Sequence, residues 1–351
     1  MTGVADVATV APANVGELAD LLRQASIDQV PVLVVGGGTR QGYGEPVDPG
    51  LVVNTGGLSG IEAWDPDDLT VTVGAGTPIE ELESALSGRS QTAVLPEVPG
   101  ESTVGGAIAA GVSSLRRARL LGTRERMLEV TLVTGDGRLV RGGGRVVKNV
   151  TGYDLPRLVV GAFGSLGVIT SVCLKLWPVP GAAATVTIEV LDQAAAISRP
   201  LAVLSEDGAL RVYLWGTPEE VESSGARLGG VVERGLRWPA DPTGRYRWSL
   251  RVPPASTAEA LRRLPPGWHH LAVFGAGDIR LGSDDAEGAQ GLRSWAESTG
   301  GNLVVVERPD GESAQFDPWG SPPPGLDIQR RLIAQFDPAR ILNPGRLPGG
   351  I

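Results

Sequence analysis

The amino-acid sequence predicts an α+β protein with a glycine-rich first region and a second region of different composition. Short apolar runs that end at glycine or proline turns recur along the chain, which is the pattern of strands and tight turns. Stretches with apolar residues at helical spacing lie between these runs. Six of the eight tryptophans follow residue 180. A chain of 351 residues is long enough for two domains, or for one large domain with an insertion.

In the first region, helices and strands are expected in alternation. Asn14 is suited to cap a helix whose apolar positions include Leu18 and Leu22. A second helix is expected to open at Thr77 and Pro78, with the hydroxyl as the cap and the proline just inside. Strands are expected at residues 31–35, 51–54, 69–73, 127–134, 139–140 and 168–177.

The second region mixes strand and helix patterns of ordinary length. Strands are expected at residues 185–191, 210–215, 271–274 and 303–306, and helices near residues 218–227, 256–264 and 285–297. A final helix is expected over residues 326–336, before a turn at residues 343–345.

Composition excludes several classes of function. A net charge of −9 argues against general nucleic-acid binding. The single cysteine, Cys173, excludes an internal disulfide and a self-contained iron–sulfur cluster, and its place in an apolar strand indicates a small buried hydrophobe. The only histidines, His269 and His270, are adjacent on a predicted strand, so they point to opposite faces and cannot jointly chelate a metal. We therefore expect no metal site.

The N-terminus lacks the basic and apolar segments of a signal peptide, and no apolar run approaches the roughly 20 residues of a membrane-spanning helix. We therefore expect a cytoplasmic protein without a transmembrane segment, one that reaches the inner face of the membrane only through partners.

Gly36, Gly37 and Gly38 directly follow a predicted buried strand. Glycine lets a backbone approach a phosphate closely, and successive amides turned inward form an anion-binding hollow. A Rossmann turn is excluded, because Gln41 stands where the third glycine belongs, no amphipathic helix follows, and an acidic residue about 20 positions further on is missing. The alternative interpretation is a plain glycine loop between strands.

A second segment of very small residues runs from Ser102 and Thr103 to Gly111. A helix that begins here has no bulky side chains, so it can lie against a pyrophosphate and a flat ring system while its amides face the anion. The alternative is a small-residue helix packed closely on a sheet.

Together, residues 32–44 and 98–111 resemble the two FAD-embracing loops of the vanillyl-alcohol-oxidase family, whose FAD-binding domain is of the PCMH type. Residues 147–155 (VKNVTGYDL) and 158–170 (LVVGAFGSLGVIT) are similar to blocks of the flavin subunits of glycolate oxidase. Residues 336–346 (FDPARILNPGR) resemble the closing motif of the family. No family motif stands in residues 181–322.

This resemblance implies a PCMH-type FAD-binding domain of two α/β subdomains over residues 1–180, an inserted α+β cap domain over residues 181–322, and a segment, residues 323–351, that returns to the FAD domain. It implies non-covalent FAD, because an arginine occupies the loop region where a histidine that attaches the ring can stand. The residues expected around the pyrophosphate are Gly36, Gly37, Gly38, Thr39, Arg40, Ser102, Thr103, Gly105 and Gly106. Those expected near the adenosine half are Gly164, Gly167, Val168 and Ile169.

The motifs do not identify the catalytic residues. Lys148 is a candidate to face a reduced flavin or a substrate carboxylate, and the alternative is a surface lysine at a strand end. Tyr153 is the other candidate, although Tyr153 and Asp154 can instead tie the Gly152 turn into the sheet. Residues 111–148 carry nine Arg or Lys against three Asp or Glu, which is either a solvated face or an anion-binding or docking surface.

The resemblance further implies an FAD-dependent oxidoreductase, the shorter flavin subunit of a glycolate-oxidase-like complex that supports 2-hydroxy acid oxidation and electron transfer. The implied partners are a larger FAD-binding subunit and an iron–sulfur subunit, and the substrate is a small 2-hydroxy acid. One alternative is a stand-alone FAD-dependent dehydrogenase of a 2-hydroxy acid or sugar acid. Another is a purely structural subunit.

Overall fold

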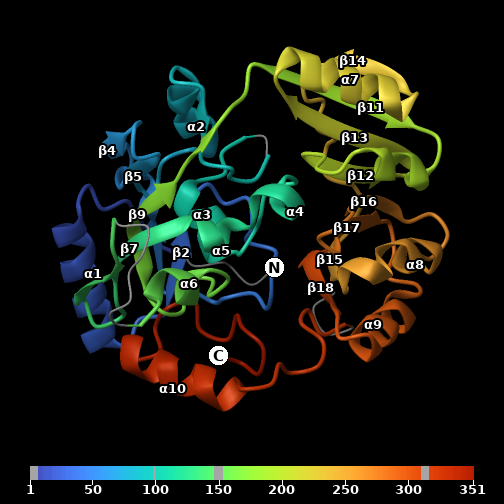
Figure 1. The fold of residues 1–351 in the computed structure, drawn as a ribbon. Helices are drawn as coiled ribbons and strands as arrows, with labels where there is room; N and C mark the ends of the chain where they lie inside the picture. Colours follow the sequence, from blue (N-terminus) through green and yellow to red (C-terminus); the bar gives the residue numbers. More distant parts are fainter. Residues whose placement is uncertain (1–6, 98–99, 146–152, 310–315) are drawn as a thin grey trace.

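The computed structural model describes residues 7–97, 100–145, 153–309 and 316–351. Two parts lie side by side (Figure 1). The first holds the elements up to β10 together with the last helix, α10, and the second holds β11 to β18 (Figure 1). The chain therefore crosses to the second part after β10 and returns before α10.

Three sheets build the first part. One is parallel, with the strand order β1-β3-β2, formed by β1 (Thr9–Val10), β2 (Val32–Val35) and β3 (Leu51–Asn54). The five-stranded antiparallel sheet has the order β4-β5-β9-β7-β8, formed by β4 (Ile61–Asp65), β5 (Thr70–Gly74), β7 (Met127–Val133), β8 (Leu139–Gly143) and β9 (Val168–Lys175). A short antiparallel pair joins β6 (Gln91–Thr92) and β10 (Trp177–Pro178).

Helices cover these sheets. They are α1 (Val15–Asp28), η1 (Thr55–Gly57), α2 (Ile79–Ser87), α3 (Val104–Ala109), α4 (Arg117–Leu120), α5 (Thr123–Arg126), α6 (Leu155–Val159) and α10 (Leu326–Phe336). The Asn14 side chain accepts a hydrogen bond from the Glu17 amide at 3.0 Å, so it caps α1 as expected. The five-stranded sheet shares its core with apolar residues of α2, α3 and α6, such as Leu82, Ile108 and Val159.

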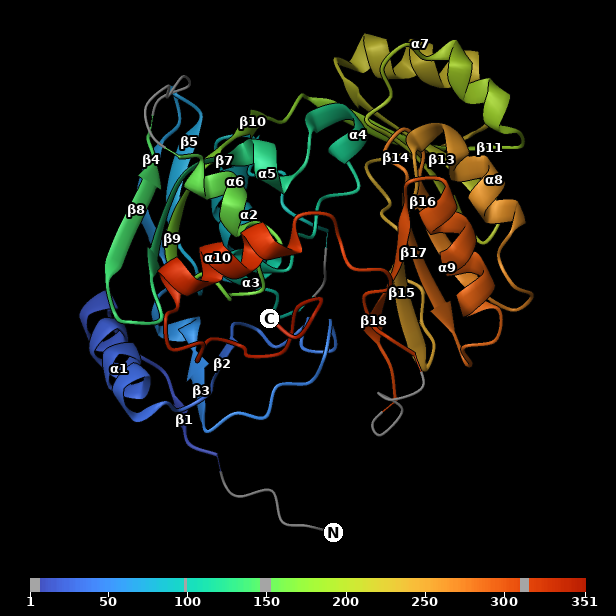
Figure 2. The ribbon, with the colours of Figure 1, turned by 90° about the horizontal axis from the view of Figure 1, so that it is seen from below.

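The second part is an eight-stranded antiparallel sheet with the order β14-β11-β13-β12-β16-β17-β15-β18. Its strands are β11 (Ala182–Ile188), β12 (Ala202–Glu206), β13 (Ala209–Gly216), β14 (Val231–Arg234), β15 (Tyr246–Arg251), β16 (His269–Val273), β17 (Asp278–Ser283) and β18 (Asn302–Glu307). Its helices are η2 (Leu191–Ala196), α7 (Pro218–Leu228), η3 (Pro254–Ser256), α8 (Thr257–Arg262) and α9 (Ala289–Ser298). Figure 2 shows α7, α8 and α9 on the side of this sheet that faces away from the first part.

The inner face of the large sheet packs on the first part. Tyr213, Leu271 and Val273 of the sheet share one buried cluster with Leu115 and Leu120. This contact holds the large sheet beside the glycine-rich loops. No helix among the described residues is both long and apolar enough to cross a membrane.

Most predicted elements are present, with shifted ends. The predicted cap at Thr77 is wrong: Pro78 is the N-cap of α2, and the Thr77 hydroxyl instead accepts a hydrogen bond from the Gly60 amide at 2.8 Å. The predicted strand 168–177 is two strands, β9 and β10, which pair with different neighbours. The strand patterns did not predict β1, β4, β6, β12, β14, β15 or β17. In β15 and β17, polar and arginine residues hide a strand pattern in which only one face is apolar.

Candidate functional site

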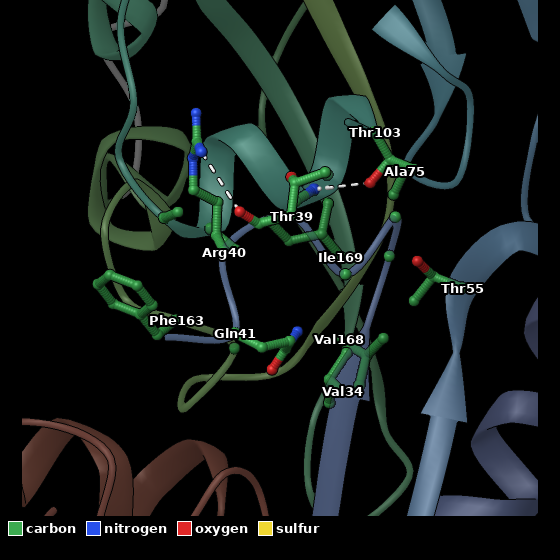
Figure 3. A pocket seen from close by; sticks show the side chains of 18 of the residues that line it. Val34, Thr39, Arg40, Gln41, Thr55, Ala75, Thr103, Phe163, Val168 and Ile169 are labelled. Carbon is green, nitrogen blue, oxygen red and sulfur yellow. Dashed lines mark hydrogen bonds between the residues drawn. The ribbon is translucent and has the colours of Figure 1, made fainter. Parts of the chain in front are cut away.

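A cavity that opens to solvent lies in the first part, where three glycine-rich segments meet, with about 650 Å³ of space including its open mouth. We call it the glycine cavity. It is lined by Val34, Gly36, Gly37, Gly38, Thr39, Arg40, Gln41, Thr55, Ala75, Thr103, Gly105, Gly106, Ala109, Ala110, Phe163, Gly164, Gly167, Val168, Ile169 and Arg346. Figure 3 shows these segments around the hollow: the loop after β2, the small face of α3, and the loop that leads into β9.

The loop after β2 has backbone amides without an internal partner. Among the described residues, the N–H groups of residues 37–41 donate no hydrogen bond. The carbonyl groups of Arg40 and Gln41, in contrast, accept hydrogen bonds from Arg346 at 3.0 Å each. Gly38 has a φ of +72°, which favours glycine. A loop with unpaired amides and satisfied carbonyls is suited to bind an anion.

Glycine is required in this loop because neighbours come close. A Cβ atom on Gly37 would lie 1.5 Å from the carbonyl oxygen of Glu101, and one on Gly36 would lie 2.3 Å from the hydroxyl of Thr103. The loop after β2 therefore packs directly on the segment that leads into α3.

Helix α3 contributes a smooth wall. Thr103 is its N-cap, and the Thr103 hydroxyl accepts a hydrogen bond from the Gly106 amide at 3.2 Å. The Val104 and Gly105 amides donate to the carbonyl groups of Thr77 and Ala75, so the first amides of this helix already have partners. The expectation that they face an anion is therefore wrong, because the protein itself occupies them.

The loop before β9 closes the other side of the cavity. Phe163, Gly164 and Gly167 have positive φ angles of 49°, 76° and 145°. The Asn343 side chain donates to the Phe163 carbonyl at 2.8 Å and accepts from the Val34 amide at 3.0 Å. The closing segment of the chain thus ties this loop to strand β2.

All but one of the predicted cofactor residues line this one cavity. The exception is Ser102, which is 2% exposed and whose carbonyl accepts from the Ile79 amide at 2.9 Å. Arg346 and Phe163 are among the lining residues that the sequence motifs did not predict. Both stand inside motifs that resemble the family, but a motif alone does not tell which of its side chains turns inward.

A second cavity, of about 530 Å³, adjoins the glycine cavity at Arg40 and extends to the large sheet. We call it the arginine cavity, because Arg40, Arg247, Arg251 and Arg280 line it together with two aspartates, Asp241 and Asp278. A third, open cavity of about 980 Å³ shares Phe163 with the first and Arg251 with the second.

The two aspartates of the arginine cavity are engaged in ion pairs. Asp241 pairs with Arg280 and lies 4.0 Å from Arg40, and Asp278 pairs with Arg117 at 3.1 Å. Tyr43 also lines this cavity, and burial raises the pKa of its phenol above the usual value. No local motif identifies these groups, because they come together from segments that are far apart in the chain.

The two catalytic candidates do not join these cavities. Lys148 lies outside the described residues, as does the Gly152 turn. Tyr153 is 97% exposed, and its side chain lines none of the cavities described above. Asp154 caps α6, since its carboxylate accepts from the Arg157 amide at 3.2 Å.

Part of the positive charge over residues 111–148 is engaged within the protein. Arg116 pairs with Glu97 at 2.6 Å, and the guanidinium of Arg126 lies 5.2 Å from the centre of the Trp177 ring. Arg141 pairs with Glu129 at 2.7 Å. Arg116 and Arg126 are buried and stabilise the fold, whereas the Arg138 and Arg141 side chains are 58% and 59% exposed, so an anion-binding or docking surface stays a prediction.

The two histidines lie outside the cavities. His269 is exposed and contacts the Asp207 carboxylate at 2.8 Å, while the His270 ring lies 3.0 Å from the Ser205 hydroxyl. Burial lowers the pKa of His270. Both rings nevertheless approach the same carboxylate, with His269 at 2.8 Å and His270 at 3.7 Å from Asp207, so the prediction that they point to opposite faces is not confirmed. Cys173 is buried in β9, as predicted, and the described residues contain no cluster of side chains suited to a metal ion.

Comparison with known proteins identifies the fold. A family profile described as an FAD binding domain matches residues 7–143. The solved structure of an alkyldihydroxyacetonephosphate synthase shares the fold, with a TM-score of 0.66 and 14% identity, over 96% of this chain and 75% of that one. The fold and the glycine cavity therefore define a PCMH-type FAD-binding protein.

Three named relatives show which group of FAD-binding proteins this chain resembles. Glycolate oxidase subunit GlcE of Escherichia coli is 31% identical, over 94% of this chain and 96% of that protein. Glycolate oxidase subunit GlcD of Bacillus subtilis is 34% identical, over 97% of this chain and 88% of that protein. A D-lactate dehydrogenase of Archaeoglobus fulgidus is 34% identical, over 48% of this chain and 38% of that protein. The chain belongs to the family of FAD-binding oxidoreductases that includes the glycolate oxidase subunits.

Proposed function

We propose that this chain is the FAD-binding subunit of a glycolate-oxidase-like complex, in which it supports 2-hydroxy acid oxidation and electron transfer. The observation that carries the proposal is the pairing of an FAD-type cavity with a site rich in arginine and free of histidine. Near full-length similarity to glycolate oxidase subunits supports the same assignment.

In this proposal, the glycine cavity holds FAD. The amides of residues 37–41 face the pyrophosphate, and residues 164–169 lie beside the adenosine half. The small residues of α3 leave room for the rest of the cofactor. When bound, FAD supplies the acceptor for the hydride of the substrate.

The cofactor is held without a covalent bond, since neither histidine nor Cys173 lines the glycine cavity. Acid precipitation of the holoprotein should therefore release all of its flavin into the supernatant. Flavin that stays with the pellet would refute this part of the proposal.

The arginine cavity is the proposed site for the carboxylate of the acid. Arg251 provides a permanent positive charge that matches a carboxylate, whereas Arg280 is paired with Asp241. A complete dehydrogenase also needs a base for the hydroxyl proton, worth about 10²–10⁴-fold in rate. Arginine cannot act as this base, because it stays protonated. Asp241 and Asp278 are also poor candidates for the base, because each is paired with an arginine. The chain is thus proposed to depend on partners for the oxidation.

The proposed partners are a larger FAD-binding subunit and an iron–sulfur subunit. The proposed division of the chain is an FAD domain over residues 1–180, a cap over residues 181–322, and a returning segment over residues 323–351. We also propose that the chain is cytoplasmic and that it contacts a membrane only through its partners.

A stand-alone dehydrogenase of a 2-hydroxy acid or sugar acid is the second candidate. The arginine cavity and the partial similarity to a D-lactate dehydrogenase favour it. Anaerobic mixing of the FAD-loaded chain with glycolate, D-lactate or L-lactate separates the two. We expect the flavin absorbance to persist with the chain alone and to bleach with glycolate once the co-purified partners are added.

Rapid bleaching of the isolated chain by any of the three acids would support the stand-alone dehydrogenase instead. A folded chain that purifies without flavin and binds none would support a purely structural subunit.

A further inference from the structure

Arg346 is a buried arginine that no carboxylate among the described residues neutralises. It is 4% exposed, and burial lowers the pKa of its guanidinium to about 10, with no charged group raising it again. The guanidinium is therefore still protonated near neutral pH. A buried charge without a counter-ion is costly for a protein, so such a group calls for an explanation.

The hydrogen bonds of Arg346 all go to neutral acceptors in one loop. Its Nε donates to the Tyr43 carbonyl at 3.1 Å, and one terminal nitrogen donates to the carbonyl groups of Arg40 and Gln41 at 3.0 Å each. The other terminal nitrogen donates to the Gln41 side chain at 3.0 Å. Arg346 thus holds the carbonyl side of the loop whose amides are unpaired.

The same arginine lines the glycine cavity, so its charge lies at the wall of the hollow. The Phe163 ring, 5.6 Å from the guanidinium carbon, covers it with an aromatic surface rather than an anion. The missing counter-charge is therefore expected inside the cavity. FAD carries two negative charges on its diphosphate, which the unpaired amides of residues 37–41 are suited to bind.

We propose that Arg346, contributed by the closing segment of the chain, is the positive charge that balances the diphosphate of FAD. The proposal concerns cofactor binding alone and is independent of which acid is oxidised or which partners are present. It extends the FAD site well beyond residues 7–143, which the family profile covers.

A purely structural role is the rival explanation, since Asn343 in the same segment ties Val34 to Phe163 without any charge. The two explanations differ in what a lysine does at position 346. Lysine keeps the charge but cannot reproduce the planar fork that donates to several carbonyl groups at once. Glutamine loses both the charge and the fork.

The experiment measures FAD affinity of the flavin-free full chain by the change in flavin fluorescence. It compares the wild type with Arg346→Gln, Arg346→Lys and, as a control, Arg340→Gln, which removes an exposed charge from the same segment. We expect Arg346→Gln to weaken FAD binding about 10- to 100-fold, and Arg346→Lys and Arg340→Gln to change it by no more than a few fold.

Salt provides an independent readout. Raising the ionic strength from about 0.05 M to about 0.5 M should weaken FAD binding to the wild type and to Arg346→Lys, and less so to Arg346→Gln. Equal losses in the lysine and glutamine variants would overturn the proposal in favour of the structural role. If Arg346→Gln does not fold, a wild-type affinity that is insensitive to salt, or a lysine variant that folds but binds no FAD, would overturn it equally.

Discussion

Two glycine-rich segments line the same cavity, yet they offer it different groups. The loop over residues 37–41 has unpaired amides, while its carbonyl groups at positions 40 and 41 are held by an arginine from the far end of the chain. In α3 the first backbone amides donate hydrogen bonds to neighbouring carbonyl groups and to the Thr103 hydroxyl. Similar composition therefore serves two purposes: one segment is suited to bind an anion, and the other provides a thin wall.

One position in each segment, Gly37 and Gly106, differs in how tightly glycine is required. Gly37 faces the backbone of Glu101, which cannot move aside without shifting the chain. Gly106 faces only the Thr103 hydroxyl, 2.9 Å from where its Cβ would lie. Substitutions at the two positions should consequently separate damage to the fold from damage to the cofactor site.

The largest effect is expected for Gly37→Val. The new side chain would overlap the Glu101 carbonyl, so the loop must shift. We expect a loss of roughly 3 kcal/mol or more in the free energy of unfolding of the flavin-free chain, together with loss of FAD binding. Thermal or urea unfolding, followed by flavin titration, checks both. If Gly37→Val were as stable as the wild type, the predicted overlap between its side chain and the Glu101 carbonyl would be contradicted.

Gly106→Val should affect the cofactor without the same cost to the fold. A β-branched side chain on the small face of α3 would enter the glycine cavity, so bound flavin should fall below roughly a tenth of the wild-type content. Gly291→Val is the matched control, because Gly291 lies in α9 with open space around it. Flavin retained by a folded Gly106→Val chain at the level of this control would contradict the assignment of α3 to the cofactor wall.

The smallest effect is expected for Thr103→Ala. Its hydroxyl caps α3, so its removal should cost about 1 kcal/mol of stability. Thr217→Ala, which removes the equivalent cap of α7 far from the cavity, should cost about the same. FAD affinity should change by no more than a few fold in either variant. A selective drop in FAD affinity of Thr103→Ala beyond about 30-fold would mean that this hydroxyl contacts the cofactor directly.

Patterns within single segments of the sequence predicted a helix and the segments of the cavity. The boundaries of α10 agree with the expectation for residues 326–336, because the apolar spacing of an amphipathic helix is a property of its own sequence. The glycine motifs likewise identified the segments that line the cavity, because many of its close contacts and positive φ angles fall at glycines such as Gly37, Gly38 and Gly164. The family resemblance rests on these glycine motifs together with residues 147–155, 158–170 and 336–346.

The sequence by itself therefore determined the class of fold, the cofactor family and the segments of the cavity. Only the tertiary structure decided which amides are unpaired, since the hydrogen bonds of α3 run to Ala75 and Thr77, on a different segment. It also decided the partners of Arg346, which lie some three hundred positions earlier in the chain. Contacts between distant segments depend on how the sheets pack, and no local pattern of residue types encodes that.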